Sequence, residues 1–382
     1  MFQKLFILCI GICFGFVISP SVSNSSERYD FLRLYAKVLN LVESSYVETV
    51  DEKKIVLNSV RGMLGGLDPY SAYLEKDDFK DFQSETLGRF GGLGIEVIME
   101  GGFLQIISPI EDSPAERAGI KPGDRIISID GEIVRGLDIV EASKKLRGNI
   151  GTTINLTIKR DGTSKLLNYK IKRDKITIRS IKSKTLDLEN GIHYVRITSF
   201  LEQTSKDFKK FMTKALKAGT VKGLIIDLRG NPGGLLKQAV EMADFFIEKG
   251  DIVSTIGRDK AQKNVLHAAK EGTLDASIKL TVLIDEGSAS ASEILAGALK
   301  DHKRAKILGQ KSYGKGSVQS VIPLENGDGV KLTIAKYYSP NGHVIDKKGV
   351  APDIELKPEK KEYKIKDIEN DPWVIEARKL LI

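Results

Sequence analysis

The stretch from Leu280 to Gln319 decides the fold of this chain. It begins Leu280-Thr281-Val282-Leu283-Ile284-Asp285, continues Glu286-Gly287-Ser288-Ala289-Ser290-Ala291-Ser292-Glu293, and later reads Tyr313-Gly314-Lys315-Gly316-Ser317-Val318-Gln319. The first six residues are typical of a buried strand, and a turn of small residues follows. A helical apolar stripe comes next, formed by Ile294, Leu295, Ala298 and Leu299. The sequence therefore predicts a strand, a tight turn and a helix, an arrangement that exposes a side chain at the helix N-terminus.

A serine in such a turn can act as a nucleophile, because free N–H groups and the positive end of the helix dipole stabilise an oxyanion there. None of the four histidines (His193, His267, His302 and His343) has a Ser–His–Asp context. A lysine whose pKa is lowered by burial can take the place of the histidine as base. Lys315 lies between Gly314 and Gly316, which lets the backbone pack closely and leaves the amine in a cleft. The structural alternative is an ordinary N-cap turn and a surface Gly-Lys-Gly turn, and Ser288 and Ser292 are alternatives to Ser290 as nucleophile.

Ser290, Lys315 and Gln319 resemble the Ser/Lys dyad and adjacent glutamine of the carboxyl-terminal processing (tail-specific) proteases, serine peptidases of family S41 that carry a PDZ domain. The resemblance implies that Ser290 is the nucleophile, that Lys315 is the base, and that Gln319 orients the lysine through a hydrogen bond.

A second part of the resemblance is Asp227-Leu228-Arg229-Gly230-Asn231-Pro232-Gly233-Gly234, which follows a strongly apolar strand and precedes a helix. The Gly-Gly turn can supply one oxyanion N–H, from Gly233 or Gly234, while Ala291 supplies the other. We interpret Asp227 and Arg229 as structural rather than catalytic.

Length and composition fit a soluble, multidomain globular protein. The chain has 382 residues, of which 41% are hydrophobic and 29% charged, and this length favours two or three domains. The net charge of +8 comes from 59 basic and 51 acidic residues that are interspersed along the chain. Without a basic run or interleaved aromatic residues, a dedicated nucleic-acid surface is not expected.

Residues 1–26 resemble a bacterial secretory signal, with Lys4, an apolar run from Leu5 to Ile18 and small residues at its end. An uncleaved membrane anchor is the alternative. Cys9 and Cys13 are the only cysteines, so cleavage would exclude disulfides, thiol catalysis and a cysteine-ligated metal. We expect an exported protein, in the periplasm or at the outer face of the inner membrane.

Residues 27–84 are predicted to form a helical N-terminal region. Phe31, Tyr35, Val38 and Val42 have the spacing of one helix face. Asp68-Pro69-Tyr70-Ser71 follows as an aromatic turn. Similar proteases carry this segment in an N-terminal region that contributes to dimer contacts in some members.

Residues 85–172 resemble a PDZ domain. The glycine cluster at 88–94 precedes a strand instead of following one, which excludes a dinucleotide-binding loop. The resemblance lies in Gly92-Leu93-Gly94-Ile95, Ser113-Pro114-Ala115 and the run from Pro122 to Gly131. It implies that Gly92, Leu93, Gly94 and Ile95 bind a peptide C-terminus, since an exposed strand edge and free N–H groups suit that ligand. Arg147 is a candidate link between this domain and the active site, and a PDZ domain that serves only as a spacer is the alternative.

Residues 173–356 alternate strands and helices as in an α/β core, and residues 357–382 read as a charged linker and a short helix. The run Gly309–Lys315 begins like a phosphate loop, but Gly316 replaces the required Ser or Thr. No metal-ligand spacing is present, so neither a metal nor a cofactor is expected.

The predicted fold is therefore an α/β multidomain protein with an N-terminal helical region, a PDZ-like β-rich domain and a crotonase-like α/β protease core. The predicted function is a serine endopeptidase that cleaves proteins near their C-terminus after the PDZ domain has bound the C-terminal residues. The resemblance implies protein or peptide substrates with apolar C-termini, and it allows for a homodimer or higher oligomer and for membrane association through the N-terminus. The alternatives are a non-catalytic PDZ scaffold on a degenerate hydrolase core, and an acyl-CoA enzyme of the crotonase-like architecture.

Overall fold

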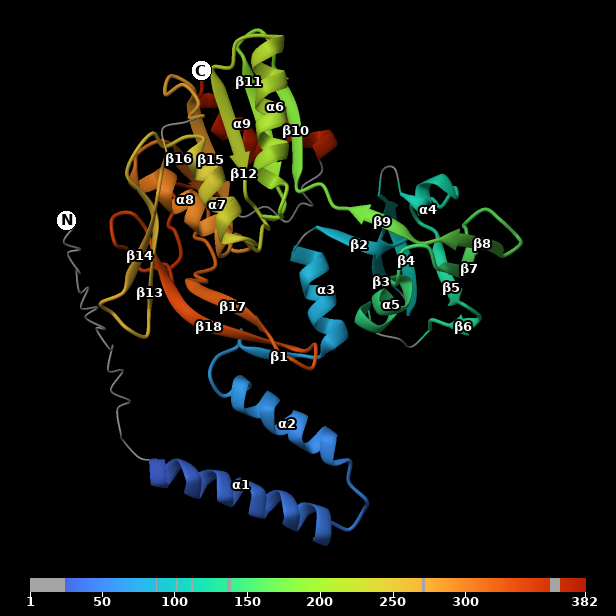
Figure 1. Cartoon of the computed structure of the whole chain (residues 1–382). Helices are drawn as coiled ribbons and strands as arrows, with labels where there is room; N and C mark the ends of the chain where they lie inside the picture. Colours follow the sequence, from blue (N-terminus) through green and yellow to red (C-terminus); the bar gives the residue numbers. More distant parts are fainter. Residues whose placement is uncertain are drawn as a thin grey trace, which may run out of the picture. The chain divides into compact units, whose positions relative to one another are not determined.

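The computed structural model describes residues 25–86, 88–100, 102–110, 113–135, 139–269, 272–357 and 365–382 (Figure 1). Most of the predicted signal segment, with Cys9 and Cys13, lies outside the described residues, as do the predicted helix start at Leu137 and much of the predicted linker. The chain divides into two compact units, residues 1–66 and residues 67–382. Within the described ranges, none of the helices has the length and hydropathy of a membrane span.

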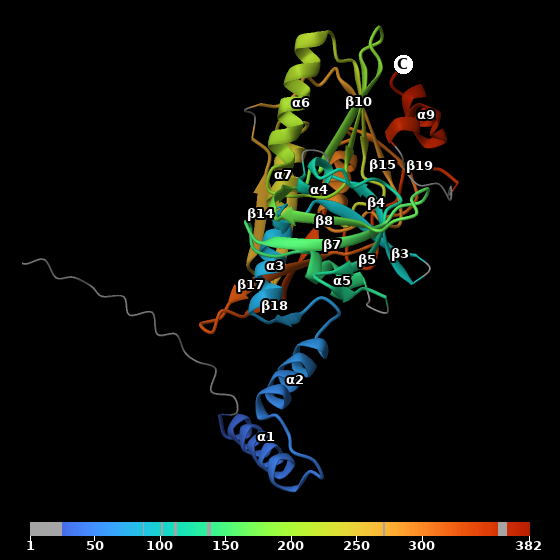
Figure 2. The same cartoon turned by 90° about the vertical axis from the view of Figure 1, so that its right-hand side faces the viewer.

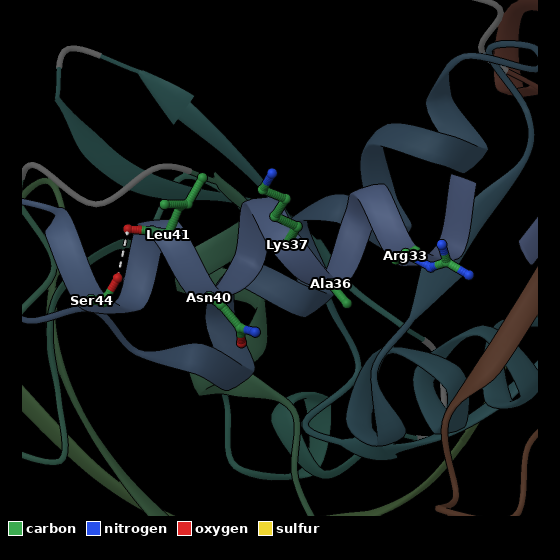
Figure 3. A pocket seen from close by; sticks show the side chains of 6 residues that line it. All are labelled: Arg33, Ala36, Lys37, Asn40, Leu41 and Ser44. Carbon is green, nitrogen blue, oxygen red and sulfur yellow. Dashed lines mark hydrogen bonds between the residues drawn. The ribbon is translucent and has the colours of Figure 1, made fainter. Parts of the chain in front are cut away.

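The first unit contains two helices, α1 (Ser25–Ser45) and α2 (Glu52–Gly65). Asp51 caps α2 by accepting a hydrogen bond from Lys54 N at 3.1 Å, and Tyr35 and Ser59 connect the helices through their hydroxyls at 2.7 Å. A shallow surface pocket of about 360 Å³ lies along α1 (Figure 3) and is lined by Arg33, Ala36, Lys37, Asn40, Leu41 and Ser44. The apolar face predicted for this helix remains exposed, with Phe31 at 69% and Val38 at 50%.

The PDZ-like part of the second unit is a sheet in the order β3-β4-β5-β7-β8, with β6 paired to β5. Its strands are β3 (Ile95–Glu100), β4 (Phe103–Pro109), β5 (Arg125–Ile129), β6 (Glu132–Ile133), β7 (Thr153–Lys159) and β8 (Leu167–Lys172), and its helices are α4 (Pro114–Arg117) and α5 (Ile139–Leu146). Alternate residues of β7, Ile154, Leu156 and Ile158, are buried in its core as period-2 patterning requires. The strand β3 is at the edge of this sheet, with β4 as its partner.

Two further strands, β2 (Arg89–Gly92) and β9 (Asp174–Thr177), pair antiparallel where the chain enters and leaves this sheet. The helix α3 (Lys76–Thr86) precedes β2 and contributes Asp78, which forms a 2.9 Å ion pair with Lys144 of α5.

The predicted α/β core contains a six-stranded sheet in the order β10-β11-β12-β15-β16-β19. All strands of this sheet are parallel except β10, which pairs antiparallel with β11. The strands are β10 (Ile181–Asp187), β11 (Ile192–Ile197), β12 (Gly223–Asp227), β15 (Lys279–Ile284), β16 (Lys306–Gly309) and β19 (Ile354–Glu355). The helices α6 (Thr204–Ala218), α7 (Leu236–Asp244) and α8 (Ala291–Asp301) cover one face, and α9 (Pro372–Lys379) covers the other (Figure 2).

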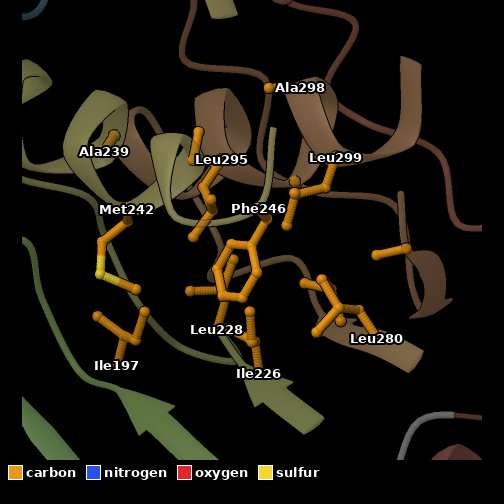
Figure 4. Close-up of a cluster of buried hydrophobic side chains, with 14 of the residues drawn as sticks. Ile197, Ile226, Leu228, Ala239, Met242, Phe246, Leu280, Leu295, Ala298 and Leu299 are labelled. Carbon is orange, nitrogen blue, oxygen red and sulfur yellow. The ribbon is translucent and has the colours of Figure 1, made fainter. Parts of the chain in front are cut away.

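Alternation along the strands produces these two faces. Leu224 and Ile226 of β12 pack under α7 and α8, whereas Ile225 between them packs against α9. The larger cluster is shown in Figure 4, where Met242, Phe246 and Leu295 meet side chains of the sheet. Burial of each such side chain stabilises the fold by about 1.5–3 kcal/mol. The helix predicted after Gly234, which the sequence suggests runs from Leu235 to Glu248, ends at Asp244, and Phe246 and Ile247 beyond it are buried in this core.

A second sheet has the order β1-β18-β13-β14, with β17 on the other side of β18. It comprises β1 (Ala72–Leu74), β13 (Asp251–Gly257), β14 (Lys263–His267), β17 (Ser317–Pro323) and β18 (Gly329–Tyr338). Although β1 lies within the range predicted as the helical region, it pairs with Gly329–Lys331 of β18, and Phe79 of α3 packs against Gly329. The segment after Gly66 thereby becomes part of the α/β core.

Candidate active site

The carboxyl ends of the neighbouring parallel strands β12 and β15 bring two loops together. Loop 228–234 follows β12, and loop 285–290 follows β15. In open α/β sheets, ligands bind outside the carboxyl ends of the strands. The serines on either side of Ser290 fasten the loops: Ser288 Oγ donates to Leu228 O at 2.8 Å, and Ser292 Oγ donates to Asn231 O at 3.0 Å. Both serines are fully buried and hydrogen-bonded to backbone.

Ser290 is the residue immediately before α8 and has a backbone conformation that non-glycine residues rarely adopt, with φ 53° and ψ −113°. Such strain persists only where the surroundings fix it, and it is characteristic of turns that present a nucleophile. The hydroxyl of Ser290 makes a hydrogen bond of 3.2 Å with the hydroxyl of Tyr337 on β18. Burial raises the pKa of Tyr337, so this phenol is neutral at ordinary pH.

The glycine turn lies directly against Ser290. A Cβ on Gly233 (φ 104°) would be 2.8 Å from Ser290 Cβ, and a Cβ on Gly234 would be 2.3 Å from Phe200 O, so neither position accepts a side chain. The N–H of Gly233 donates to Asn231 Oδ1 at 2.9 Å. Among the described residues, no protein acceptor is recorded for the N–H of Gly234 or of Ala291. Of the two glycines considered for the oxyanion site, Gly234 therefore has the available donor.

Glu293 joins the serine turn to the segment that carries Lys315. Its side chain is fully buried, and its two oxygens accept four hydrogen bonds. Oε2 accepts from the backbone N–H of Ser290 at 2.8 Å and of Lys315 at 2.9 Å, and Oε1 accepts from Ser312 Oγ at 2.5 Å and Gly314 N at 2.7 Å. Burial raises the pKa of this carboxyl, while the four donors act in the opposite direction. One carboxylate oxygen thus holds the backbones of both dyad candidates together.

The amine of Lys315 is half-buried and lies 4.7 Å from the centroid of the Tyr70 ring. Burial lowers the pKa of Lys315, nearby Lys331 lowers it further, and Glu293 raises it. The net direction is the one that a lysine base requires. No hydrogen bond between Lys315 Nζ and Ser290 Oγ is recorded among the described residues.

Gln319 has different partners from the one predicted. Its amide nitrogen donates to Ser317 Oγ at 2.7 Å and to Thr333 Oγ1 at 3.4 Å, and no bond to Lys315 occurs among the described contacts. The reason is local: Ser317 and Gln319 are two residues apart on β17, so both side chains are on the same face of the strand.

Asp227 and Arg229 form a buried ionic cluster beneath the glycine turn. Arg229 is 1% exposed, is 2.7 Å from Asp227 and 3.0 Å from Asp371, and has its guanidinium 5.3 Å from the centroid of a Trp373 ring. The C-terminal helix α9 is therefore attached to the start of the loop that carries Gly233 and Gly234, in agreement with a structural role for the pair.

In the PDZ-like part, the residues predicted to bind peptide lead into the edge strand β3. Gly94 has φ 74°, and a Cβ there would be 2.4 Å from Ser113 Cβ, so the turn requires glycine. Leu93 is 2% exposed in the domain core, and its carbonyl accepts from Ala115 N at 3.0 Å. The guanidinium of Arg147 lies 5.0 Å from the centroid of the Phe90 ring. Phe90 is on β2, the strand that leads into this turn.

Sequence reasoning assigned no role to Glu293, Tyr337 or Tyr70. Glu293 carried a signal, because Ser290-x-x-Glu293 has the spacing of a capping box. No such signal pointed to Tyr337 or Tyr70. Tyr337 reaches the site because it is on β18, and Tyr70 because the strand β1 that follows it pairs with β18. In the part of the chain that the structure describes, no group of three His, Cys, Asp or Glu side chains could hold a metal ion.

This fold, with a strained serine at a helix N-terminus beside a glycine turn, defines a hydrolase of the serine-peptidase class. Comparison with known families assigns it further: residues 191–356 match the model for peptidase family S41, residues 91–171 match a PDZ domain, and residues 18–78 match the activating protease CtpB N-terminal domain.

Two curated relatives match most of the chain. The carboxy-terminal-processing protease of Bartonella bacilliformis is 41% identical over 378 residues, covering 96% of this chain and 86% of the relative. Carboxy-terminal processing protease CtpB of Bacillus subtilis is 39% identical over 342 residues, covering 89% and 71% respectively. The chain belongs to the carboxy-terminal processing proteases of peptidase family S41.

Among solved structures, the photosystem II D1 C-terminal processing protease is similar with a TM-score of 0.54 and 29% identity, covering 91% of this chain and 97% of that one. A putative S41 protease of Bacteroides fragilis has a TM-score of 0.53 at 14% identity, over 84% and 90%, and shows the fold alone. The predicted family, fold class and enzyme class are confirmed: the chain is a peptidase with a PDZ domain, and its substrates are proteins.

Proposed function

We propose that this peptidase uses a Ser290/Lys315 dyad to cleave proteins near their C-terminus, after the PDZ domain has bound the terminal residues. The observation that carries the proposal is the pair of hydrogen bonds from Ser290 N and Lys315 N to one oxygen of Glu293, at 2.8 and 2.9 Å. It keeps a strained serine and a lysine of lowered pKa in one site. The hydroxyls of Ser288 and Ser292 are committed to backbone carbonyls, which favours Ser290 as nucleophile.

In the proposed reaction, Ser290 Oγ attacks the carbonyl carbon of the scissile peptide bond and its proton passes to the neutral amine of Lys315. The N–H groups of Ala291 and Gly234 stabilise the oxyanion, and Gly233 supports the turn. The C–N bond then breaks as Lys315 returns the proton to the leaving amine. Water attacks the acyl-enzyme by the same route, with Lys315 again as base, and releases the new C-terminus.

Gln319 is proposed to orient Lys315. Its amide nitrogen donates to Ser317 and Thr333, and among the described residues no donor to its carbonyl oxygen is recorded. That oxygen can accept a hydrogen bond from the Lys315 amine, which only donates while it is protonated, so the amide nitrogen keeps its two partners.

For substrate capture, we propose that a peptide C-terminus adds to β3 and that its carboxylate meets the N–H groups of the Gly92-Leu93-Gly94-Ile95 turn. The open edge of β3 supports this assignment. Arg147, which stacks on Phe90 of β2, is proposed to transmit peptide binding towards the protease core.

The test is cleavage of an unstructured protein with an apolar C-terminus by the wild type, Ser290→Ala and Lys315→Ala. Each change should lower kcat by several orders of magnitude without loss of folding. Amidation of the substrate C-terminus should raise KM, because the terminal charge is lost. Equal cleavage by all three proteins would refute the dyad, and peptide binding without cleavage would indicate a scaffold.

We further propose export to the periplasm or the outer face of the inner membrane, and self-association through the N-terminal helices. Residues 1–26 support the first, and the exposed apolar side chains of α1 support the second. Cell fractionation and light scattering of the purified protein test them; a cytoplasmic protein and a monomer at all concentrations would refute them.

A further inference from the structure

Tyr70 contacts the lysine that we propose as the base. The Nζ atom of Lys315 lies 4.7 Å from the centroid of the Tyr70 ring. A ring face attracts an ammonium through its negative quadrupole and gains much less from a neutral amine. Ser290 Oγ is meanwhile hydrogen-bonded to Tyr337 at 3.2 Å. Each member of the proposed dyad therefore has a tyrosine as its neighbour.

The backbone that carries Tyr70 is held by hydrogen bonds. The carboxylate of Asp68 accepts hydrogen bonds from Tyr70 N at 2.7 Å, Ser71 N at 2.8 Å and Ser71 Oγ at 2.9 Å. Ser71 Oγ in turn accepts a 3.2 Å bond from Thr333 N of β18. These bonds and the pairing of β1 with β18 fix the backbone at Tyr70 beside the strand that carries Tyr337. The contact with Lys315 is thus made by a side chain on an anchored backbone.

We propose that Tyr70 is a positioning residue for the peptidase reaction, whose ring face holds the protonated amine of Lys315 and releases the neutral amine towards Ser290. The inference rests on the proposed function, because it takes Lys315 as the base. Its chemical basis is selectivity for charge: proton loss removes the attraction to the ring, while it creates the lone pair that a serine hydroxyl can use.

Several charged groups act on the same amine. Lys331 of β18 opposes its protonation, and Glu293 of α8 favours it. Tyr313 and Asp346 lie near Tyr70 and act on its phenol, and Tyr337 faces Ser290. The Tyr70 ring, like Glu293, favours the protonated form of Lys315. Removal of the ring should therefore lower the pKa of Lys315 and move the acid limb of the reaction to lower pH.

The experiment measures the second-order rate of labelling of the full chain by a fluorophosphonate as a function of pH. In this reaction Ser290 Oγ forms a bond to phosphorus, fluoride leaves, and the hydroxyl proton passes to Lys315, so no peptide binding is needed. The variants are Tyr70→Leu, which removes the ring, and Tyr70→Phe, which keeps the ring and removes the hydroxyl.

We expect Tyr70→Phe to keep the wild-type midpoint and Tyr70→Leu to lower it by about 0.5 to 1 pH unit. Coincident profiles for wild type and Tyr70→Leu would overturn the inference. A shift with Tyr70→Phe equal to that with Tyr70→Leu would also overturn it, since the hydroxyl would then be the active group. If Tyr70→Leu fails to fold, Tyr70→Trp offers a stronger ring face and should raise the midpoint; an unchanged midpoint would refute the inference.

The result separates this inference from the proposed function. A wild type that is not labelled, or a Lys315→Ala variant that is labelled as fast as wild type, refutes the dyad itself. Labelling that depends on Lys315 but has the same pH profile in every Tyr70 variant refutes only the role of Tyr70.

Discussion

Replacing Glu293 with glutamine should loosen the junction between the serine turn and the lysine segment. The carboxylate is fully buried and accepts two hydrogen bonds on each oxygen. An amide keeps one oxygen and puts an NH₂ group against the other two donors. Losing two bonds to a charged acceptor costs about 3–6 kcal/mol. The amide carries no charge to desolvate, which offsets part of this loss, and we expect a net destabilisation of about 2–4 kcal/mol.

The assay for Glu293→Gln is urea unfolding followed by fluorescence of the single tryptophan, Trp373, which is 4% exposed in the protease core. The rate of fluorophosphonate labelling should fall at least tenfold as well, because Ser290 and Lys315 lose their common anchor. Glu286→Gln, in the exposed part of the same turn, is the matched control. Destabilisation below about 0.5 kcal/mol, the level of an ordinary surface change, together with wild-type labelling would refute the anchoring role.

Two other changes test the site from different sides. Gly233→Ala places a Cβ 2.8 Å from Ser290 Cβ and should lower the labelling rate about a hundredfold. Gly230→Ala, whose Cβ would meet only the Arg196 guanidinium at 3.9 Å, an ordinary van der Waals contact, should show only the destabilisation due to its φ of 65°. Equal labelling by both variants would contradict this. Lys331→Met removes a charge that lowers the pKa of Lys315, so the acid limb of kcat/KM should move to higher pH, and a shift to lower pH would refute the electrostatic assignment.

The features of the site that sequence reasoning identified are local ones. The strand–turn–helix around Ser290 and the glycines at 233 and 234 are recognisable because small residues between apolar runs permit few other structures. The PDZ-like order of elements was also readable, since alternating strands such as β7 bury every second residue. Each of these inferences depends on residues close together in the chain.

What the sequence did not reveal depends on long-range pairing. Tyr337 contacts Ser290 from β18. Tyr70 contacts Lys315 because β1 pairs with β18 and Ser71 accepts a hydrogen bond from Thr333 of the same strand. Neither the register nor the partner of an antiparallel strand follows from its own residues. The hydrogen bond from Gln319 to Lys315 stays a prediction, since in this structure the Gln319 amide nitrogen donates to a hydroxyl two residues away on the same face of β17.

The two halves of the proposed site differ in how firmly they are held. The loop with the oxyanion donors is fastened to the serine turn by Ser288 and Ser292 and to α9 by the ion pairs of Arg229, so its strained conformation is fixed from both sides of the sheet. The side chain of Lys315, by contrast, contacts the Tyr70 ring through a non-directional attraction, and among the described residues its amine makes no hydrogen bond that would break when it leaves the ring. We therefore predict that control of this peptidase through the proposed site acts on the lysine, while the N–H groups proposed for the oxyanion stay in place.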